Sequence, residues 1–234
     1  MAIMKDSVTV IIPTLNEEAN ICEIIEELKR TGYSNIMVMD GNSSDGTVEV
    51  ARKLGATVLS QKGQGKGAAL IEAFGNCDGV DGEVFVMMDA DGSMSPKEIQ
   101  LFLEAMDSGA DVVKGSRFLR GGGTQDMNLT RRLGNEFFLK LVNLFWSARY
   151  TDLCYGFAAF RKSALLKLYP FLTSKNFDIE AEIYVKSKKL DLRVKEVPSL
   201  EFRRRYGKSN LQIVPTGFRI LKTIAKEFLD TYRR

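Results

Sequence analysis

The 234-residue sequence contains no histidine. This absence excludes Ser-His-Asp and Cys-His triads, a histidine general base and the usual histidine-containing zinc sites. Any metal site must therefore use oxygen ligands, which suit Mg²⁺ or Mn²⁺. Cysteine is also scarce, because Cys22, Cys77 and Cys154 are the only three and lie far apart. Their odd number and wide spacing argue against a disulfide framework and indicate a reducing compartment.

No stretch approaches the roughly 18 apolar residues of a membrane span, and residues 1–14 lack the order of charged and apolar segments found in signal peptides. We therefore expect a cytoplasmic protein. Neither charge sign dominates, because 33 basic residues face 30 acidic ones. A net charge of +3 is too small for general binding to nucleic acid. Any binding of anions by basic residues must therefore depend on a local group of these residues.

The composition, with 44% hydrophobic and 27% charged residues, predicts a single globular domain over residues 1–234. Short β-branched runs alternate with helical patterns, which is typical of an α/β fold whose mostly parallel sheet has helices on both faces. The expected strands are residues 8–12, 36–39, 57–59, 84–88, 112–113, 157–160 and 192–197. The expected helices are residues 17–30, 46–54, 67–76, 96–108, 129–149, 179–188 and 211–234.

Two carboxylates, Asp89 and Asp91, directly follow the apolar run 84–88. In such sheets, ligands bind beyond the carboxyl ends of the strands. A divalent cation held there could bridge to a diphosphate and neutralise a leaving group. An ordinary turn at Asp91-Gly92 is the alternative. A calcium loop is excluded by its spacing, because Met94 stands where the glycine belongs.

Two further loops follow expected strands. Asp40 ends an apolar run with no evident partner, so it could accept hydrogen bonds from a base or ribose. Asp45 could cap the next helix. Residues 63–67 place glycine amides and Lys66 before a helix, which suits phosphate binding. This segment is not a Walker loop, because Gly67 stands where serine or threonine must follow, and a flexible loop is the alternative.

The order of these motifs resembles the family 2 glycosyltransferases of the GT-A (Rossmann-like) fold, and among them the dolichyl-phosphate mannose and glucose synthases. The motifs that carry the resemblance are Pro13-Thr14-Leu15-Asn16-Glu17, Asp40, Asp45-Gly46-Thr47, Gly65-Lys66-Gly67, Asp89-Ala90-Asp91-Gly92, Gly115-Ser116-Arg117, Asp152–Phe157, Phe177–Glu180 and Arg204–Ser209. The resemblance implies a nucleotide-sugar-binding half over residues 1–118 and an acceptor half over residues 119–234.

The resemblance also implies roles for individual residues. Asp89 and Asp91 would hold Mg²⁺ or Mn²⁺. The UDP- or GDP-sugar would be bound by Pro13, Thr14, Glu17, Asp40, Lys66, Asp89, Ala90 and Asp91. The sequence departs from the mannose synthase pattern at Ser93, where a glutamine commonly contacts the metal, and at Asn210, where lysine is usual. These departures leave the donor sugar open.

A polyprenyl (dolichyl) phosphate acceptor needs no strong base, because its phosphate is already largely anionic at neutral pH. Inverting transfer would then depend on positioning and on charge stabilisation. We expect Arg117, Arg131, Arg204 and Lys208 to hold the acceptor phosphate, and Asp91, Arg117 and Arg204 to be catalytic. For Arg131, an exposed surface position is the alternative.

Three other functions remain open from the sequence. A family 2 enzyme that acts on a glycan hydroxyl would need a carboxylate base, for which Asp152, Asp178 and Glu180 are candidates. A sugar nucleotidyltransferase would use a similar nucleotide-binding half and release pyrophosphate. A non-catalytic sensor would bind a nucleotide sugar without turnover.

Two helices of the acceptor half are expected to lie against a membrane. Residues 135–149 have only a narrow polar stripe, with Trp146 among the apolar residues. In the terminal helix, one face carries Val214, Phe218, Leu221, Ala225, Phe228 and Tyr232, and positive charge comes from Arg219, Lys222, Lys226, Arg233 and Arg234. We expect peripheral association with the cytoplasmic face of the membrane. A core position or a contact with another subunit is the alternative.

Overall fold

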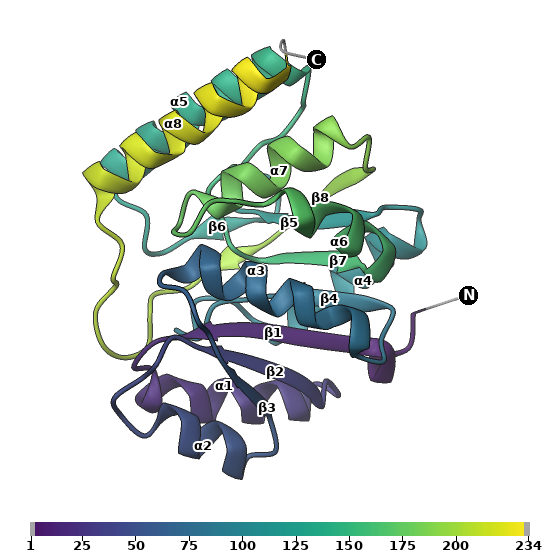
Figure 1. The fold of residues 1–234 in the computed structure, drawn as a ribbon, viewed down its shortest axis with the longest axis vertical. Coiled ribbons are helices and arrows are strands. Elements are labelled where there is room, and N and C mark those ends of the chain that lie inside the picture. Colours follow the sequence, from purple (N-terminus) through teal and green to yellow (C-terminus); the bar gives the residue numbers. More distant parts are fainter. Residues whose placement is uncertain (1–2, 232–234) are drawn as a thin grey trace.

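The computed structural model describes residues 3–231, and its centre is a seven-stranded sheet in the order β3-β2-β1-β4-β7-β5-β8 (Figure 1). Only β7 runs antiparallel to its neighbours, β4 and β5. The strands are β1 (Val8–Thr14), β2 (Asn35–Asp40), β3 (Thr57–Ser60), β4 (Val84–Met87), β5 (Val112–Ser116), β7 (Ala158–Arg161) and β8 (Val194–Pro198). The predicted α/β fold with a mostly parallel sheet is confirmed.

Helices cover both faces of this sheet. Successive side chains of a strand point to opposite faces, so β1 sends Val10 into one apolar cluster and Ile11 into the other. The Val10 cluster is covered by α1 (Glu18–Arg30), α2 (Thr47–Lys53) and α4 (Ile99–Asp107). The Ile11 cluster is covered by α3 (Lys66–Asn76), α6 (Lys162–Leu168) and α7 (Ile179–Lys189).

Two long helices, α5 (Leu129–Trp146) and α8 (Ile213–Thr231), lie side by side against α7 (Figure 1). Ile220 and Ile224 of α8 face the core. On the predicted apolar face of α8, Val214 is 66% and Phe218 70% exposed, whereas Phe228 is half-buried against Phe145 of α5. Residues Tyr232, Arg233 and Arg234, which we expected on this helix, lie outside the described residues.

Several predicted boundaries were wrong for local reasons. The helix expected over residues 96–108 begins with a separate 3₁₀ turn, Pro96–Glu98. The helix expected to reach residue 149 ends at Trp146, because Ser147 adopts a left-handed φ of 49°. Trp146 is half-buried and packs edge-on against Phe228 of α8.

Three short elements were not predicted, namely α6, β6 (Gly123–Thr124) and β9 (Leu200–Glu201). The two strands pair in parallel as a separate small sheet, and two residues are too few to show a periodic pattern. Within residues 3–231, no helix combines the length and the apolar character that crossing a lipid bilayer requires.

Candidate functional site

A cavity of about 880 Å³ lies beyond the carboxyl ends of β1, β4 and β5. This is the edge at which open α/β sheets bind ligands. Of the predicted site residues, the cavity is lined by Pro13, Thr14, Glu17, Lys66, Asp89, Ala90, Asp91, Arg117, Arg131 and Arg204. Asp40 and Lys208 are not in its lining. The fold therefore gathers most of the predicted donor and acceptor residues around one space.

Lys66 lies between two acids at the floor of this cavity. Its Nζ is 2.6 Å from Oδ1 of Asp89 and 2.9 Å from Oε1 of Glu180. Burial opposes the charge of the ammonium, but the two carboxylates outweigh burial and raise the pKa of Lys66 above its usual value. Burial also disfavours the charged form of Glu180 and so raises its pKa, and Lys66 offsets part of that effect.

The two glycines that flank Lys66 let its loop approach the chain before α7. Gly65 has a φ of 96°, and a Cβ on Gly67 would collide with the carbonyl of Ser174. The amide of Ala68 donates to the carbonyl of Lys175 across this contact, at 3.1 Å. The predicted glycine loop is therefore a packed junction that orients Lys66, which argues against a flexible loop.

Asp89 and Asp91 both line the cavity, so their positions suit a divalent cation. The amide of Ser93 donates to Oδ1 of Asp91 at 3.0 Å, and Gly92 has a φ of 77°, so the segment is a turn as well. No group of three or more acidic or cysteine side chains suited to a metal occurs among residues 3–231. Two carboxylates fit Mg²⁺ or Mn²⁺ that takes its other ligands from phosphate and water.

Asp40 has partners that the sequence did not reveal. It is 2% exposed, and its Oδ1 accepts hydrogen bonds from Oγ1 of Thr14 at 3.2 Å and Oγ of Ser43 at 2.6 Å. Its Oδ2 accepts from the amide of Ser43 at 2.9 Å. The expectation of an unpartnered carboxylate was wrong, because Asp40 fixes the loop after β2. The N-cap residue of α2 is Gly46 and not Asp45, but Asp45 accepts from the amide of Thr47 at the start of this helix, at 3.0 Å.

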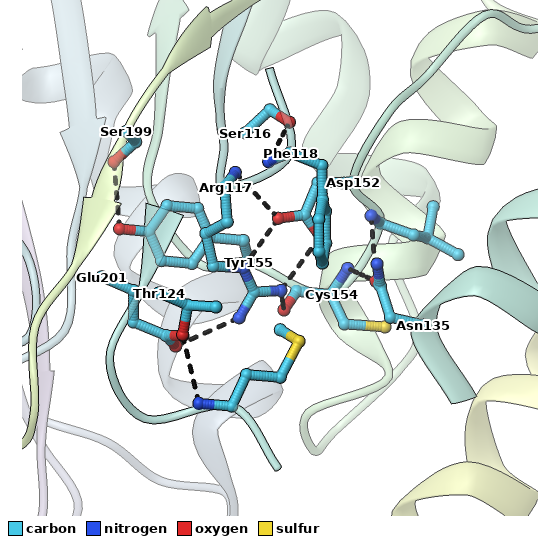
Figure 2. A network of polar contacts seen from close by, with 12 residues as sticks. Ser116, Arg117, Phe118, Thr124, Asn135, Asp152, Cys154, Tyr155, Ser199 and Glu201 are labelled. Atoms are coloured by element: carbon cyan, nitrogen blue, oxygen red, sulfur yellow. Dashed lines mark hydrogen bonds and ion pairs between the residues drawn. The ribbon is translucent and has the colours of Figure 1, made fainter. Parts of the chain in front are cut away.

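Arg117 is buried. Figure 2 shows the hydrogen-bond acceptors that surround its guanidinium. Its Nε and Nη2 donate to Asp152 at 2.7 and 2.9 Å, and its Nη1 donates to Glu201 at 3.1 Å. The carbonyl of Cys154 accepts from Nη2 at 2.7 Å. Burial opposes the charge of Asp152, but Arg117 holds the pKa of this carboxyl below its usual value. Arg117 therefore lies at the expected edge, directly after β5 and in the cavity lining, but its guanidinium is buried and paired.

Arg204 pairs with Glu17 across the mouth of the cavity. Its Nη1 lies 2.9 and 3.0 Å from the two carboxylate oxygens of Glu17. Burial raises the pKa of Glu17, although Arg204 opposes that effect. Arg131 donates to Asp126 at 3.0 Å, and its side chain is 24% exposed. Lys208 is exposed and borders the neighbouring cleft that Glu17 and Arg204 also line.

The sequence did not indicate that this cavity has an apolar wall. Side chains of α5 and α8 complete its lining, among them Phe137, Phe138, Phe218 and Leu221. Phe137 is 52% exposed and Phe218 70% exposed, so this wall continues onto the outer surface. The sequence identified both helices as apolar, but their position near the carboxyl ends of the strands depends on the tertiary fold.

The family model described as Glycosyl transferase family 2 matches residues 9–169. The chain belongs to glycosyl transferase family 2. It is therefore a glycosyltransferase, and the predicted family is confirmed. "Glycosyltransferase AglJ" of Haloferax volcanii is 32% identical over 98% of this chain and 72% of its own.

Two other relatives have names that state an acceptor. A "Dolichyl-phosphate hexose transferase" of Haloferax volcanii is 31% identical over 96% of this chain and 95% of its own. A "UDP-N-acetylglucosamine--dolichyl-phosphate N-acetylglucosaminyltransferase" of Methanococcus voltae is 27% identical over 90% of this chain and 91% of its own.

Among solved structures, glucosyl-3-phosphoglycerate synthase from Mycobacterium tuberculosis, in complex with Mn²⁺, UDP and glucosyl-3-phosphoglycerate, matches with a TM-score of 0.73 and 19% identity. The match covers 95% of this chain and 80% of that one. At this identity the similarity concerns the fold, and it supports the GT-A architecture.

Proposed function

We propose that this glycosyltransferase moves one sugar from a UDP- or GDP-sugar to a polyprenyl phosphate at a membrane surface, with inversion of the anomeric centre. One observation carries the proposal: a single cavity joins the carboxylates Asp89 and Asp91 to an apolar wall from α5 and α8. A nucleotide sugar needs the polar end of such a cavity, whereas a prenyl chain needs the apolar end. The names of the archaeal relatives support this choice of acceptor.

In this proposal, the donor occupies the polar end of the cavity. Pro13, Thr14, Glu17 and Ala90 line the space for the nucleotide, with Lys66 beneath the diphosphate. Asp89 and Asp91 would hold Mg²⁺ or Mn²⁺, which when bound neutralises charge on the departing diphosphate. Asp40 shapes this end by fixing Thr14 and Ser43.

The acceptor phosphate would enter beside Arg204 and Arg131, because both side chains line the cavity and keep some exposure. Lys208 in the adjoining cleft would add positive charge. The phosphate oxygen is already anionic, so the attack on the sugar carbon needs no proton acceptor. Arg117 is a positioning residue in this scheme, since its guanidinium is committed to Asp152 and Glu201.

The outer faces of α5 and α8 would dock to the bilayer. Leu144 on α5 and Leu229 on α8 are 74% and 57% exposed, and Arg219 and Lys222 of α8 are also exposed. Exposed apolar side chains beside basic ones are typical of helices that lie in the interface of an anionic membrane. A prenyl chain could pass from that interface to the cavity along Phe218.

Transfer to a glycan hydroxyl is the competing function, and it needs a carboxylate base. Asp152 is bound by Arg117, and Asp178 accepts a hydrogen bond from Thr223 outside the cavity lining. Glu180 lines the cavity, but Lys66 pairs with it. Of these three candidate bases, Glu180 is therefore the one that lines the cavity, and it is already paired. The family assignment favours glycosyl transfer over nucleotidyl transfer or a sensor without turnover.

The test is transfer of radiolabelled sugar from UDP- and GDP-linked donors, with Mn²⁺ or Mg²⁺ and polyprenyl phosphate in detergent micelles. We expect the label in an organic-extractable, acid-labile product. A label that appears only in water-soluble glycan would contradict the proposed acceptor. The same assay without metal would test the assigned roles of Asp89 and Asp91.

A further inference from the structure

We propose that Lys66 holds Asp89 in an ion pair until the nucleotide arrives, and then moves to the diphosphate, so that nucleotide and divalent cation bind cooperatively. The inference rests on the proposed function, because it assumes that Asp89 is a metal ligand. It assigns Lys66 a role in the enzyme without nucleotide, in addition to a contact with the bound donor.

The contact of Lys66 with Asp89 is direct and partly open to the cavity. Nζ of Lys66 lies 2.6 Å from Oδ1 of Asp89, whose side chain is 29% exposed. The Lys66 side chain itself is 10% exposed. An ammonium is a compact point charge, and a divalent cation bound to the same carboxylate would repel it. The ion pair with Lys66 therefore weakens metal binding at Asp89, and withdrawal of Lys66 would strengthen it.

The surroundings give Lys66 a second anchor. Oε1 of Glu180 lies 2.9 Å from Nζ, and its side chain is 9% exposed. Gly156 makes this convergence possible, because a Cβ there would be 2.8 Å from Nζ of Lys66, 3.0 Å from Oε1 of Glu180 and 3.4 Å from Oδ2 of Asp89. Lys66 can thus leave Asp89 while it remains paired with Glu180.

Nucleotide binding would drive this exchange. A diphosphate brings new negative charge to the cavity beside Lys66. Its oxygens can replace the carboxylate of Asp89 as the ion-pair partner of Lys66. Asp89 is then available to the metal, which also binds phosphate. By thermodynamic linkage, the nucleotide must tighten metal binding by the same factor by which the metal tightens nucleotide binding. Couplings between sites are commonly about 5–150-fold.

The experiment measures binding of Mn²⁺ to the full chain by the electron paramagnetic resonance signal of free Mn²⁺, alone and with UDP or GDP. We expect the wild-type protein to bind Mn²⁺ weakly alone and at least about fivefold more tightly with one nucleotide. Lys66→Met should bind Mn²⁺ alone about tenfold more tightly than wild type and lose most of the coupling. Lys66→Gln keeps hydrogen-bonding capacity without the charge, and it should behave similarly if the methionine variant does not fold.

Lys62→Met is the matched control. Lys62 is an exposed lysine of the same loop outside the cavity lining, so its loss changes the net charge equally. This variant should bind Mn²⁺ as the wild type does.

Unchanged or weaker binding of Mn²⁺ by folded Lys66 variants, with normal coupling in the wild type, would overturn the inference and leave the proposed function intact. If the wild-type protein and both variants bind no Mn²⁺ with either nucleotide, the metal assignment of the proposed function fails, and the inference fails with it.

Discussion

Two ion-pair clusters of this protein have the same pattern of charges but differ in the basic residue and in burial. Each contains one basic side chain and two acids, namely Arg117 with Asp152 and Glu201, and Lys66 with Asp89 and Glu180. The side chains of Arg117 and Asp152 are 1% and 0% exposed. In the other cluster, the side chain of Asp89 is 29% exposed.

The difference shows that burial and the type of cation decide whether a ligand can replace one of the ion-pair partners in a cluster. The planar guanidinium of Arg117 donates to Asp152 through two nitrogens and to further acceptors, so a competing ligand would have to break several bonds. Lys66 is a point charge with access to a cavity, so a ligand that brings its own charge can replace one partner. We therefore expect mutations of the Arg117 cluster to affect stability and mutations near Asp89 to affect activity.

The largest expected effect is on catalysis. Asp91→Asn should lower kcat/KM about 1,000-fold, because in the proposed function this charge would hold the metal against the leaving diphosphate. The free energy of unfolding should stay close to that of the wild type, since Asp91 lines an open cavity. Steady-state transfer kinetics and urea unfolding check both parts. Normal turnover of Asp91→Asn would remove the metal assignment.

The next effect is on stability. Asp152→Asn should lower the free energy of unfolding by about 3 kcal/mol, because it leaves the buried guanidinium of Arg117 without its main counter-charge. Urea unfolding at neutral pH measures this loss. A variant as stable as the wild type would show that Glu201 alone is a sufficient partner for Arg117.

The pH dependence of stability should distinguish the two clusters by sign. The folded-state pKa of Asp152 lies below its ordinary value of 3.8. The contribution of Asp152 to the stability of the fold is therefore complete above pH 3.8 and is lost as pH falls through the folded-state pKa. The pKa of Glu180 is raised above 4.5, so its contribution is present below that pH and is lost as pH rises through the folded value. Asp152→Asn should flatten the loss of stability as pH falls below 3.8, and Glu180→Gln should flatten the loss as pH rises above 4.5.

A smaller effect is expected on membrane binding. The double variant Leu144→Ser and Leu229→Ser should bind vesicles of anionic lipid about tenfold more weakly, because it removes apolar surface from α5 and α8 but not from the cavity. Leu101→Ser is the matched control, since Leu101 is 39% exposed on α4 beneath the opposite sheet face. Equal flotation of all variants would contradict the docking surface.

The smallest effect is expected at Lys208. Its exposed side chain lies outside the cavity lining, so Lys208→Ala should raise KM for polyprenyl phosphate by up to about fivefold and leave kcat unchanged. Lys97→Ala removes another exposed lysine and should change neither constant. A large fall in kcat for Lys208→Ala would instead place this residue in direct contact with the reacting groups.

The sequence by itself determined the strand-and-helix alternation, the mostly parallel sheet and the family. These features follow from local patterns, because residues 84–91 carry both the buried strand and the two carboxylates at its end. The position of Asp89 at the binding edge of the sheet then follows from the fold class alone.

Only the tertiary structure decided which charges are paired and which are available. Arg117 and Glu201 are 84 positions apart in the sequence, and Glu17 and Arg204 are 187 positions apart. The apolar wall from α5 and α8 likewise depends on packing against α7. Periodicity and turn chemistry are local, whereas burial and ion pairing depend on contacts between distant segments, and a single sequence does not specify those contacts by inspection.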